Sequence, residues 1–145
     1  MGIQALIPHR DPFLFLDFAR IESDQEIYGH SVWGKDHPIL QGHFPQRSIV
    51  PGVCLIEAGA QLAGVLLHWQ SQKHLKSQSA LGVLASVRNA KFKLALAPDE
   101  LLVLQCRVRT LNLNAYQVHC TGTTGESREL VFESEILLAQ QAPIT

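Results

Sequence analysis

Charged residues are scarce in this sequence of 145 residues. Asp, Glu, Lys and Arg make up 17% of it, below the roughly 25% of a typical soluble domain, whereas hydrophobic residues make up 46%. The 12 basic and 13 acidic residues give a net charge of −1, and the basic residues are scattered, so the sequence lacks the basic field that binds nucleic acid. Because so apolar a chain suits a buried partner-facing surface, we expect a homo-oligomer.

Features of a secreted or membrane protein are also missing. The three cysteines form no CxxC pair, and the first residues lack a charged segment followed by a sustained apolar one. The most apolar stretch, residues 53–69, is interrupted by Glu57, Gln61 and His68, so it falls short of the roughly 18 uninterrupted apolar residues of a membrane span. We therefore expect a reduced, cytoplasmic protein without a membrane span.

Motifs of the common metal, nucleotide and serine-hydrolase sites are absent. There are seven histidines, yet neither HExxH nor a Cys/His pair at zinc spacing occurs. A Gly-rich phosphate loop and GxSxG are lacking as well. The sequence therefore implies no metal and no cofactor, and a metal site assembled only in three dimensions is the less favoured alternative.

The order of the expected elements indicates an α+β fold. Residues 13–21 and 26–33 are predicted to form a hairpin, and a loop rich in Gly and Pro follows at 34–51. From Pro51 we expect a helix of about 20 residues, apolar almost all the way round and hence buried. The later strands, predicted as an antiparallel meander from alternating polarity, are 80–85, 87–94, 101–111, 115–124 and 130–138. The simplest arrangement is one domain, 1–145, whose antiparallel sheet wraps around the helix.

Two titratable residues stand out against this apolar background. Glu57 lies seven residues into the predicted helix, on one stripe with Val53 and Gln61. Burial favours the protonated form of a carboxyl group, so Glu57 is a candidate acid, and His43, in the Gly/Pro-bounded loop, is a candidate base. The backbone N–H of Gly52 at the helix start can donate to a carbonyl or oxyanion. Purely structural roles for these residues remain open on residue types alone.

Three segments carry a family resemblance. "IPHRDPFLFLD" at 7–17, "QGHFP" at 41–45 and "PGVCLIEAGAQLAG" at 51–64 resemble, in order and spacing, the hot-dog-fold 3-hydroxyacyl-acyl-carrier-protein dehydratases of the FabZ type. A weaker similarity follows in "NAKFKLALAPDE" at 89–100, where the family has a basic and aromatic strand. The resemblance implies a hot-dog fold, in which an antiparallel sheet wraps around one long central helix.

The resemblance also implies a site and a mechanism without a cofactor. The family forms dimers in which His43 of one chain would face Glu57 of the other. Glu57, rather than the Asp of the FabA-type enzymes, points to dehydration without isomerisation. The Gly52 N–H would polarise the thioester carbonyl, beside Pro51 and Phe44, while His43 removes the C2 proton and Glu57 protonates the leaving hydroxyl.

An acidic acyl carrier protein is the partner that the resemblance implies, because the family docks it on a local basic cluster. The expected docking residues are Arg10, Arg88, Lys91 and Lys93. The family has an aromatic residue at Asp11 and glycines at Gln46 and Asp99, so substrate length and pathway stay open: fatty-acid, polyketide, polyene or modified-lipid synthesis. The alternatives are a hot-dog acyl thioesterase and a non-catalytic dehydratase-like subunit that binds a carrier protein or completes a heterodimer.

Overall fold

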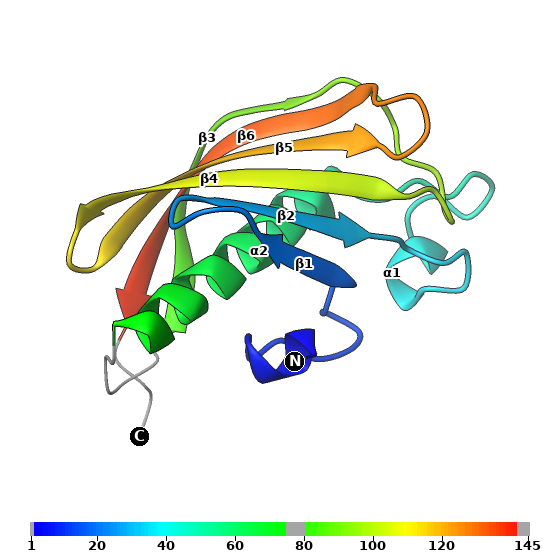
Figure 1. Ribbon diagram of the computed structural model, residues 1–145. Coiled ribbons are helices and arrows are strands. Elements are labelled where there is room, and N and C mark those ends of the chain that lie inside the picture. Colours follow the sequence, from blue (N-terminus) through cyan, green and yellow to red (C-terminus); the bar gives the residue numbers. More distant parts are fainter. Residues whose placement is uncertain (1, 75–80, 142–145) are drawn as a thin grey trace.

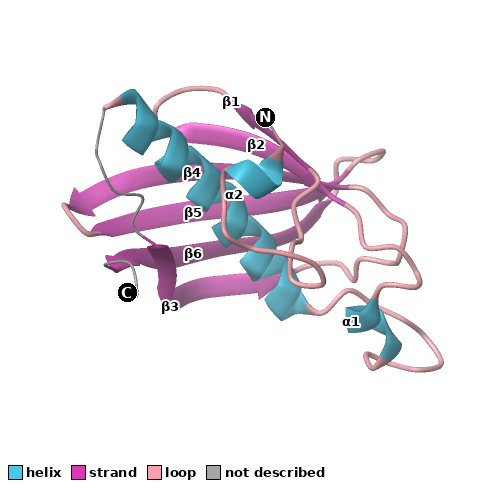
Figure 2. Ribbon diagram, turned by 90° about the horizontal axis from the view of Figure 1, so that it is seen from below, coloured by secondary structure: helices cyan, strands magenta, loops and turns pink. Residues whose placement is uncertain are grey.

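An antiparallel sheet curved around one long helix dominates the computed structural model, which describes residues 2–74 and 81–141 (Figure 1). The sheet order is β1-β2-β4-β5-β6-β3, and every pair is antiparallel. Figure 2 shows α2 lying across one face of the sheet. The elements are η1 (Ile3–Ala5), β1 (Phe18–Ile21), β2 (Glu26–Ser31), α1 (Pro38–Gln41), α2 (Gly52–Lys73), β3 (Leu81–Phe92), β4 (Leu102–Asn112), β5 (Ala115–Thr124) and β6 (Leu130–Gln141). This confirms the predicted α+β hot-dog arrangement.

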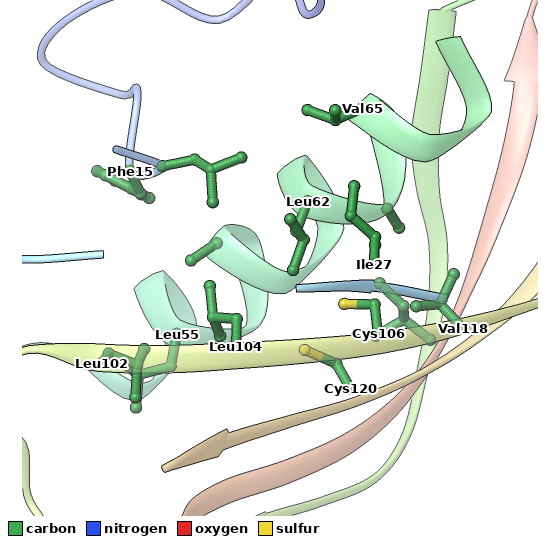
Figure 3. Packing of buried hydrophobic residues seen from close by; sticks show 14 of the residues in the cluster. Phe15, Ile27, Leu55, Leu62, Val65, Leu102, Leu104, Cys106, Val118 and Cys120 are labelled. Atoms are coloured by element: carbon green, nitrogen blue, oxygen red, sulfur yellow. The ribbon is translucent and has the colours of Figure 1, made fainter. Parts of the chain in front are cut away.

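The inner face of the sheet follows the predicted alternation of polarity. In β4, Leu104 and Cys106 are fully buried, and Cys106 is paired with the buried Cys120 of β5. Figure 3 shows the Cys106 and Cys120 side chains beneath Leu62 of α2, and Leu104 beside Leu55. Side chains alternate between the two faces of a strand, so one face packs on the helix and the other stays partly exposed.

Close contact between α2 and the sheet depends on Gly59. A Cβ atom at this position would lie 2.7 Å from Sγ of Cys120, and Sγ of Cys106 donates to the Gly59 carbonyl at 3.4 Å. Burial, together with the neighbouring Cys120, raises the pKa of the Cys106 thiol well above its usual value. The small residue therefore sets the depth of the helix, and with it the position of Glu57 two residues earlier.

The central helix is both long and apolar. Within the described residues, α2 is the one helix whose 22 residues are long and apolar enough to cross a membrane, and 67% of its most apolar window is buried inside the fold. Burial of that kind is typical of the core helix of a globular protein, as the sequence predicted.

The strands differ from the sequence-based expectation in three main respects, apart from shifts of one to three residues at several strand ends. The first strand begins at Phe18 rather than at residue 13, because backbone groups of Phe13 and Phe15 bond the Gln61 side chain instead of a neighbouring strand. The strands expected at 80–85 and 87–94 form one strand, β3, with two register shifts; residue 80 lies outside the described residues. The meander holds only for β4, β5 and β6, since β3 pairs with β6 at the sheet edge.

Candidate functional site

The loop between α1 and α2 fixes the orientation of His43. Nδ1 of the half-buried ring lies 3.0 Å from the carbonyl oxygen of Ile49, and the backbone N–H of Ile49 donates to the His43 carbonyl. Since a carbonyl can only accept, Nδ1 carries the hydrogen and Nε2 keeps a lone pair. Phe44, the expected substrate-site neighbour, is exposed and places its ring centroid 4.4 Å from that of His43. The arrangement suits a base that acts through Nε2.

Glu57 lies in the second turn of α2 and is held through one oxygen. Its Oε1 accepts a hydrogen bond of 3.1 Å from Nε2 of Gln61, and Nε2 of His9 lies 3.2 Å from the same atom. The Glu57 side chain is 20% exposed. Its second oxygen, Oε2, has no hydrogen-bond partner within the described ranges, so it is free to meet a substrate.

Gln61 fixes this arrangement from within the core. It is 1% exposed; its Oε1 accepts from the Phe15 N–H at 2.9 Å, and its Nε2 donates to the Phe13 carbonyl at 2.9 Å. Because a backbone N–H can only donate, the orientation of the amide is settled and its nitrogen must point to Glu57. The glutamine thus ties the N-terminal segment to the helix beside the carboxylate.

His9, which contacts Glu57, is not among the candidate site residues that its sequence context indicated. Its segment, "IPHR", carried the family resemblance, yet only Arg10 was singled out there. Two features of the sequence could have indicated His9: its position in this segment, and the presence of Gln61 on the same helix stripe as Glu57.

The start of α2 is open, as expected for a donor site. Pro51 is the N-cap residue and makes no side-chain capping bond. Gly52, the first helical residue, has no acceptor within the helix for its N–H. A Cβ atom at position 52 would lie 2.8 Å from the Phe92 ring, so β3 packs tightly against this turn. The next residue, Val53, is 73% exposed.

The structure does not bring His43 and Glu57 together within one chain. No hydrogen bond or ion pair joins them among the described residues; each has partners of its own. A site made from His43 of one chain and Glu57 of a second therefore remains a prediction. In residues 2–74 and 81–141, no group of three or more His, Cys, Asp or Glu side chains is arranged to hold a metal ion.

The four basic residues expected to bind a carrier protein lie in two regions of the fold. Nη1 of Arg10, in the N-terminal segment, donates to the carbonyls of Ile7 and His9. The other three are exposed along or just beyond the edge strand β3, where Arg88 lies opposite Glu135 and Lys91 opposite Glu133. Those two acidic neighbours offset part of the basic charge of this edge.

All three departures from the family pattern, Asp11, Gln46 and Asp99, lie at exposed positions. The third, Asp99, has a φ of 66°, and its N–H donates to the Trp33 carbonyl at 2.8 Å. Glycine adopts this left-handed conformation easily, and Asp is among the few other residues that tolerate it. The structure therefore accommodates Asp99 in a turn where the family has glycine.

A cavity of about 390 Å³ lies between the N-terminal segment, α2 and parts of β3 and β6. It begins at His9, close to Glu57, and follows one stripe of the helix through Ala60, Gly64 and Leu67 to Ser71. These residues are three or four apart, so they share a helix face. The cavity is thus a mainly apolar groove that begins beside the candidate acid.

Comparisons with known proteins agree with this architecture. The model of the FabA-like domain matches residues 7–134. The 3-hydroxyacyl-[acyl-carrier-protein] dehydratase FabZ of Xanthomonas oryzae pv. oryzae is 38% identical over 142 residues, which cover 94% of this chain and 88% of the relative. The same-named protein of Clostridioides difficile is 32% identical over 138 residues, with 94% and 93% covered.

Solved structures share the fold at low identity. The dehydratase heterocomplex ApeI:P from Xenorhabdus doucetiae matches with a TM-score of 0.83 and 20% identity, covering 98% of this chain and 92% of that one. A hypothetical thioesterase protein with coenzyme A from Streptococcus pneumoniae matches with a TM-score of 0.63 and 11% identity, covering 98% and 93%. The family model, the sequence relatives and the sheet around the central helix all lead to the same conclusion. The chain belongs to the FabA-like family of hot-dog proteins.

Proposed function

We propose that the protein dehydrates a 3-hydroxyacyl thioester, carried on an acyl carrier protein, to a trans-2-enoyl thioester. Relatives named for this reaction match 94% of the chain. The observation that carries the proposal is the pair of free atoms: His43 Nε2 and Glu57 Oε2 lack partners among the described residues, while the other polar atoms of both groups are held. The pathway is fatty-acid synthesis or a related polyketide, polyene or lipid synthesis.

Each group has one step in the proposed mechanism. The Gly52 N–H donates to the thioester carbonyl and thereby acidifies the C2–H bond. His43 Nε2 takes the C2 proton, and the Ile49 carbonyl at Nδ1 stabilises the imidazolium that forms. The C2 electron pair forms the C2=C3 bond, the C3–O bond breaks, and Glu57 Oε2 protonates the leaving hydroxyl so that water departs. General acid and general base are each worth typically 10²- to 10⁴-fold.

The proton balance closes over one cycle. Glu57 has given up one proton and His43 has gained one, so transfer between them, directly or through water, restores both groups. The substrate loses the elements of water and neither gains nor loses electrons otherwise. The proposed step needs no further reactant.

The site is proposed to be composite, with His43 of one protomer facing Glu57 of a second copy. Two apolar side chains flank the open helix start that would face this copy, Val53 at 73% and Phe92 at 50% exposed. Burial of such side chains is a driving force for association. A homodimer is the simplest form, and a heterodimer with a related chain stays an alternative.

The acyl tail is proposed to lie in the groove along α2. From Ala60 to Ser71 the helix rises about 16 Å at 1.5 Å per residue. The groove is mostly apolar, and His9 in its lining contacts the carboxyl group that would meet the 3-hydroxyl, which is the order of groups along the substrate. Arg10, Arg88, Lys91 and Lys93 are proposed to bind the acidic carrier protein.

We also infer that residues 1–145 form one domain, because one continuous core cluster includes side chains from Ile7 to Leu138. A cytoplasmic location is proposed too, and the three free, buried thiols are compatible with a reducing compartment.

One assay tests the proposed function. The purified protein is incubated with a 3-hydroxyacyl thioester, and the products are identified by mass spectrometry. An enoyl thioester supports dehydration, whereas free acid would indicate a thioesterase. No product from either a carrier-linked or a pantetheine-linked substrate would indicate a non-catalytic subunit.

A further inference from the structure

We propose that His9 is a positioning residue that, with Gln61, confines the acidic proton of Glu57 to Oε2. This inference rests on the proposed function, because it concerns the acid of that reaction. His9 would not touch the substrate; it would act through Glu57.

Both nitrogen atoms near the carboxyl group converge on one oxygen. Nε2 of Gln61 donates to Oε1 at 3.1 Å, and Nε2 of His9 lies 3.2 Å from that atom. In a protonated carboxyl group, the oxygen that accepts N–H donors is the carbonyl-type oxygen. Its proton must then lie on Oε2, the oxygen left free for the substrate hydroxyl.

The tautomer of His9 follows from its surroundings. Only the tautomer with hydrogen on Nε2 can donate to Glu57. Nδ1 is enclosed and has no acceptor within the described part of the chain. A lone pair at Nδ1 is tolerated there, whereas a stranded N–H would leave a buried donor unsatisfied. The environment of the ring therefore selects the tautomer that the proposed role requires.

The backbone around His9 is held in place on both sides. Arg10 donates to the carbonyls of Ile7 and His9, and Ile7 is buried in the core. Gln61, fixed by the backbone at Phe13 and Phe15, provides the second nitrogen. Support of this kind restricts both side chains before the proton is transferred, which is the advantage of preorganised groups.

Two substitutions separate positioning from mere packing. His9→Phe keeps a ring of similar size and removes the donor, whereas His9→Gln places an amide N–H near the position of Nε2. We expect His9→Phe to lower kcat about tenfold or more, a part of the 10²- to 10⁴-fold attributed to a general acid, with KM changed less than about threefold. His9→Gln should recover most of kcat. His119→Phe, a histidine on the outer face that also contacts a glutamate, is the matched control and should behave as wild type.

The outcomes are distinct. Loss in His9→Phe with recovery in His9→Gln, at similar melting temperatures, supports the inference. Equal kcat in wild type and His9→Phe overturns it, as does equal loss in both variants. If His9→Phe does not fold, His9→Asn replaces it, because its shorter amide does not reach Oε1; undiminished kcat in that variant also overturns the inference. A wild-type protein that forms no enoyl product overturns the proposed function and this inference with it.

Discussion

Two histidine–glutamate pairs in this chain differ in geometry and in surroundings. His119 and Glu133 are joined by a hydrogen bond, whereas His9 and Glu57 are in contact at ion-pair distance. His9 Nε2 lies 3.2 Å from Glu57 Oε1, with side chains 28% and 20% exposed. His119 Nε2 lies 2.9 Å from Glu133 Oε1 on the outer face of the sheet, with side chains 42% and 41% exposed. By contact distance alone, the outer pair is the closer one.

The neighbours decide what each carboxyl group can do. At the outer pair, the hydrogen bond to His119 is the main cause that lowers the pKa of Glu133, and the charges of Lys91 and Lys93 act in the same direction. At the inner pair, the neighbour that bonds Glu57 is the neutral side-chain amide of Gln61. Burial, and then the charge of Glu57, raises the pKa of the adjacent Cys54 thiol. A contact distance thus identifies a pair, whereas the neighbouring groups distinguish the two carboxyl groups: lysines lie near Glu133, and the buried amide of Gln61 bonds Glu57.

The largest expected effect comes from removing either catalytic group. His43→Ala and Glu57→Gln should each lower the rate of enoyl formation by at least about 100-fold, because one loses the base and the other an ionisable acid of nearly equal shape. Glu133→Gln makes the same change at the outer pair and should leave the rate near that of wild type. A His43→Ala or Glu57→Gln variant within about tenfold of wild type would contradict the role assigned to that residue.

A second test asks whether Glu57 serves the His43 of its own chain. Mixing inactive His43→Ala with inactive Glu57→Gln under subunit exchange should restore activity, because a mixed dimer contains one intact composite site. With random exchange, about a quarter of the wild-type sites re-form. Exchange is verified by native mass spectrometry of differently tagged chains. Persistent inactivity after verified exchange would mean that both residues act from one chain.

A smaller effect is expected at the basic sheet edge. Lys91→Glu combined with Lys93→Glu should slow turnover of a carrier-linked substrate several-fold, more at low salt, and spare a pantetheine thioester. The control is Lys91→Gln combined with Lys93→Gln. It removes the two positive charges without adding negative charges that would repel Glu133. An equal loss on both substrates would assign these lysines to the fold or the chemistry, and an unchanged rate on both would make them ordinary surface residues.

The smallest effect is the pH dependence of the outer pair. The pKa of Glu133 is lower in the folded protein than its usual value, so the unfolded chain binds the proton more readily. The pair therefore stabilises the fold above the unfolded-state pKa, about 4.3 for Glu, and this contribution is lost as pH falls through the lower folded-state pKa. Glu133→Gln should lower the melting temperature slightly at pH 7, and the difference should vanish in acid. A constant difference down to pH 2 would exclude this linkage.

Periodicity predicted the sheet and the helix because burial follows local side-chain polarity. The alternation through Leu104, Cys106 and Val118 emerged as expected, and so did the buried helix from Gly52. Residues 13–17, expected to begin the first strand, lie outside it, because the Phe13 carbonyl and the Phe15 N–H bond a glutamine side chain 46 to 48 residues away. When a side chain takes the hydrogen bonds that a neighbouring strand would make, the sequence shows no alternation of polarity that reveals it.

The candidate site was predictable only in its parts. His43 and Glu57 stand out by residue type in an unusual context, and the structure shows which atom of each is free. His9 has an ordinary context in the sequence, and its closeness to Glu57 depends on the path of the N-terminal segment. Long-range contacts of this kind need the backbone path, which composition and spacing do not contain.

The bonds of Gln61 also bear on how the protein loses activity under stress. The Phe13 carbonyl and the Phe15 N–H both bond this one buried side chain, so detaching the first fifteen residues strands a buried amide and frees Glu57 in the same event. Local opening of a chain end requires less free energy than global unfolding. Heating or limited proteolysis should therefore inactivate the enzyme while amides in β4, β5 and β6 remain protected from hydrogen exchange.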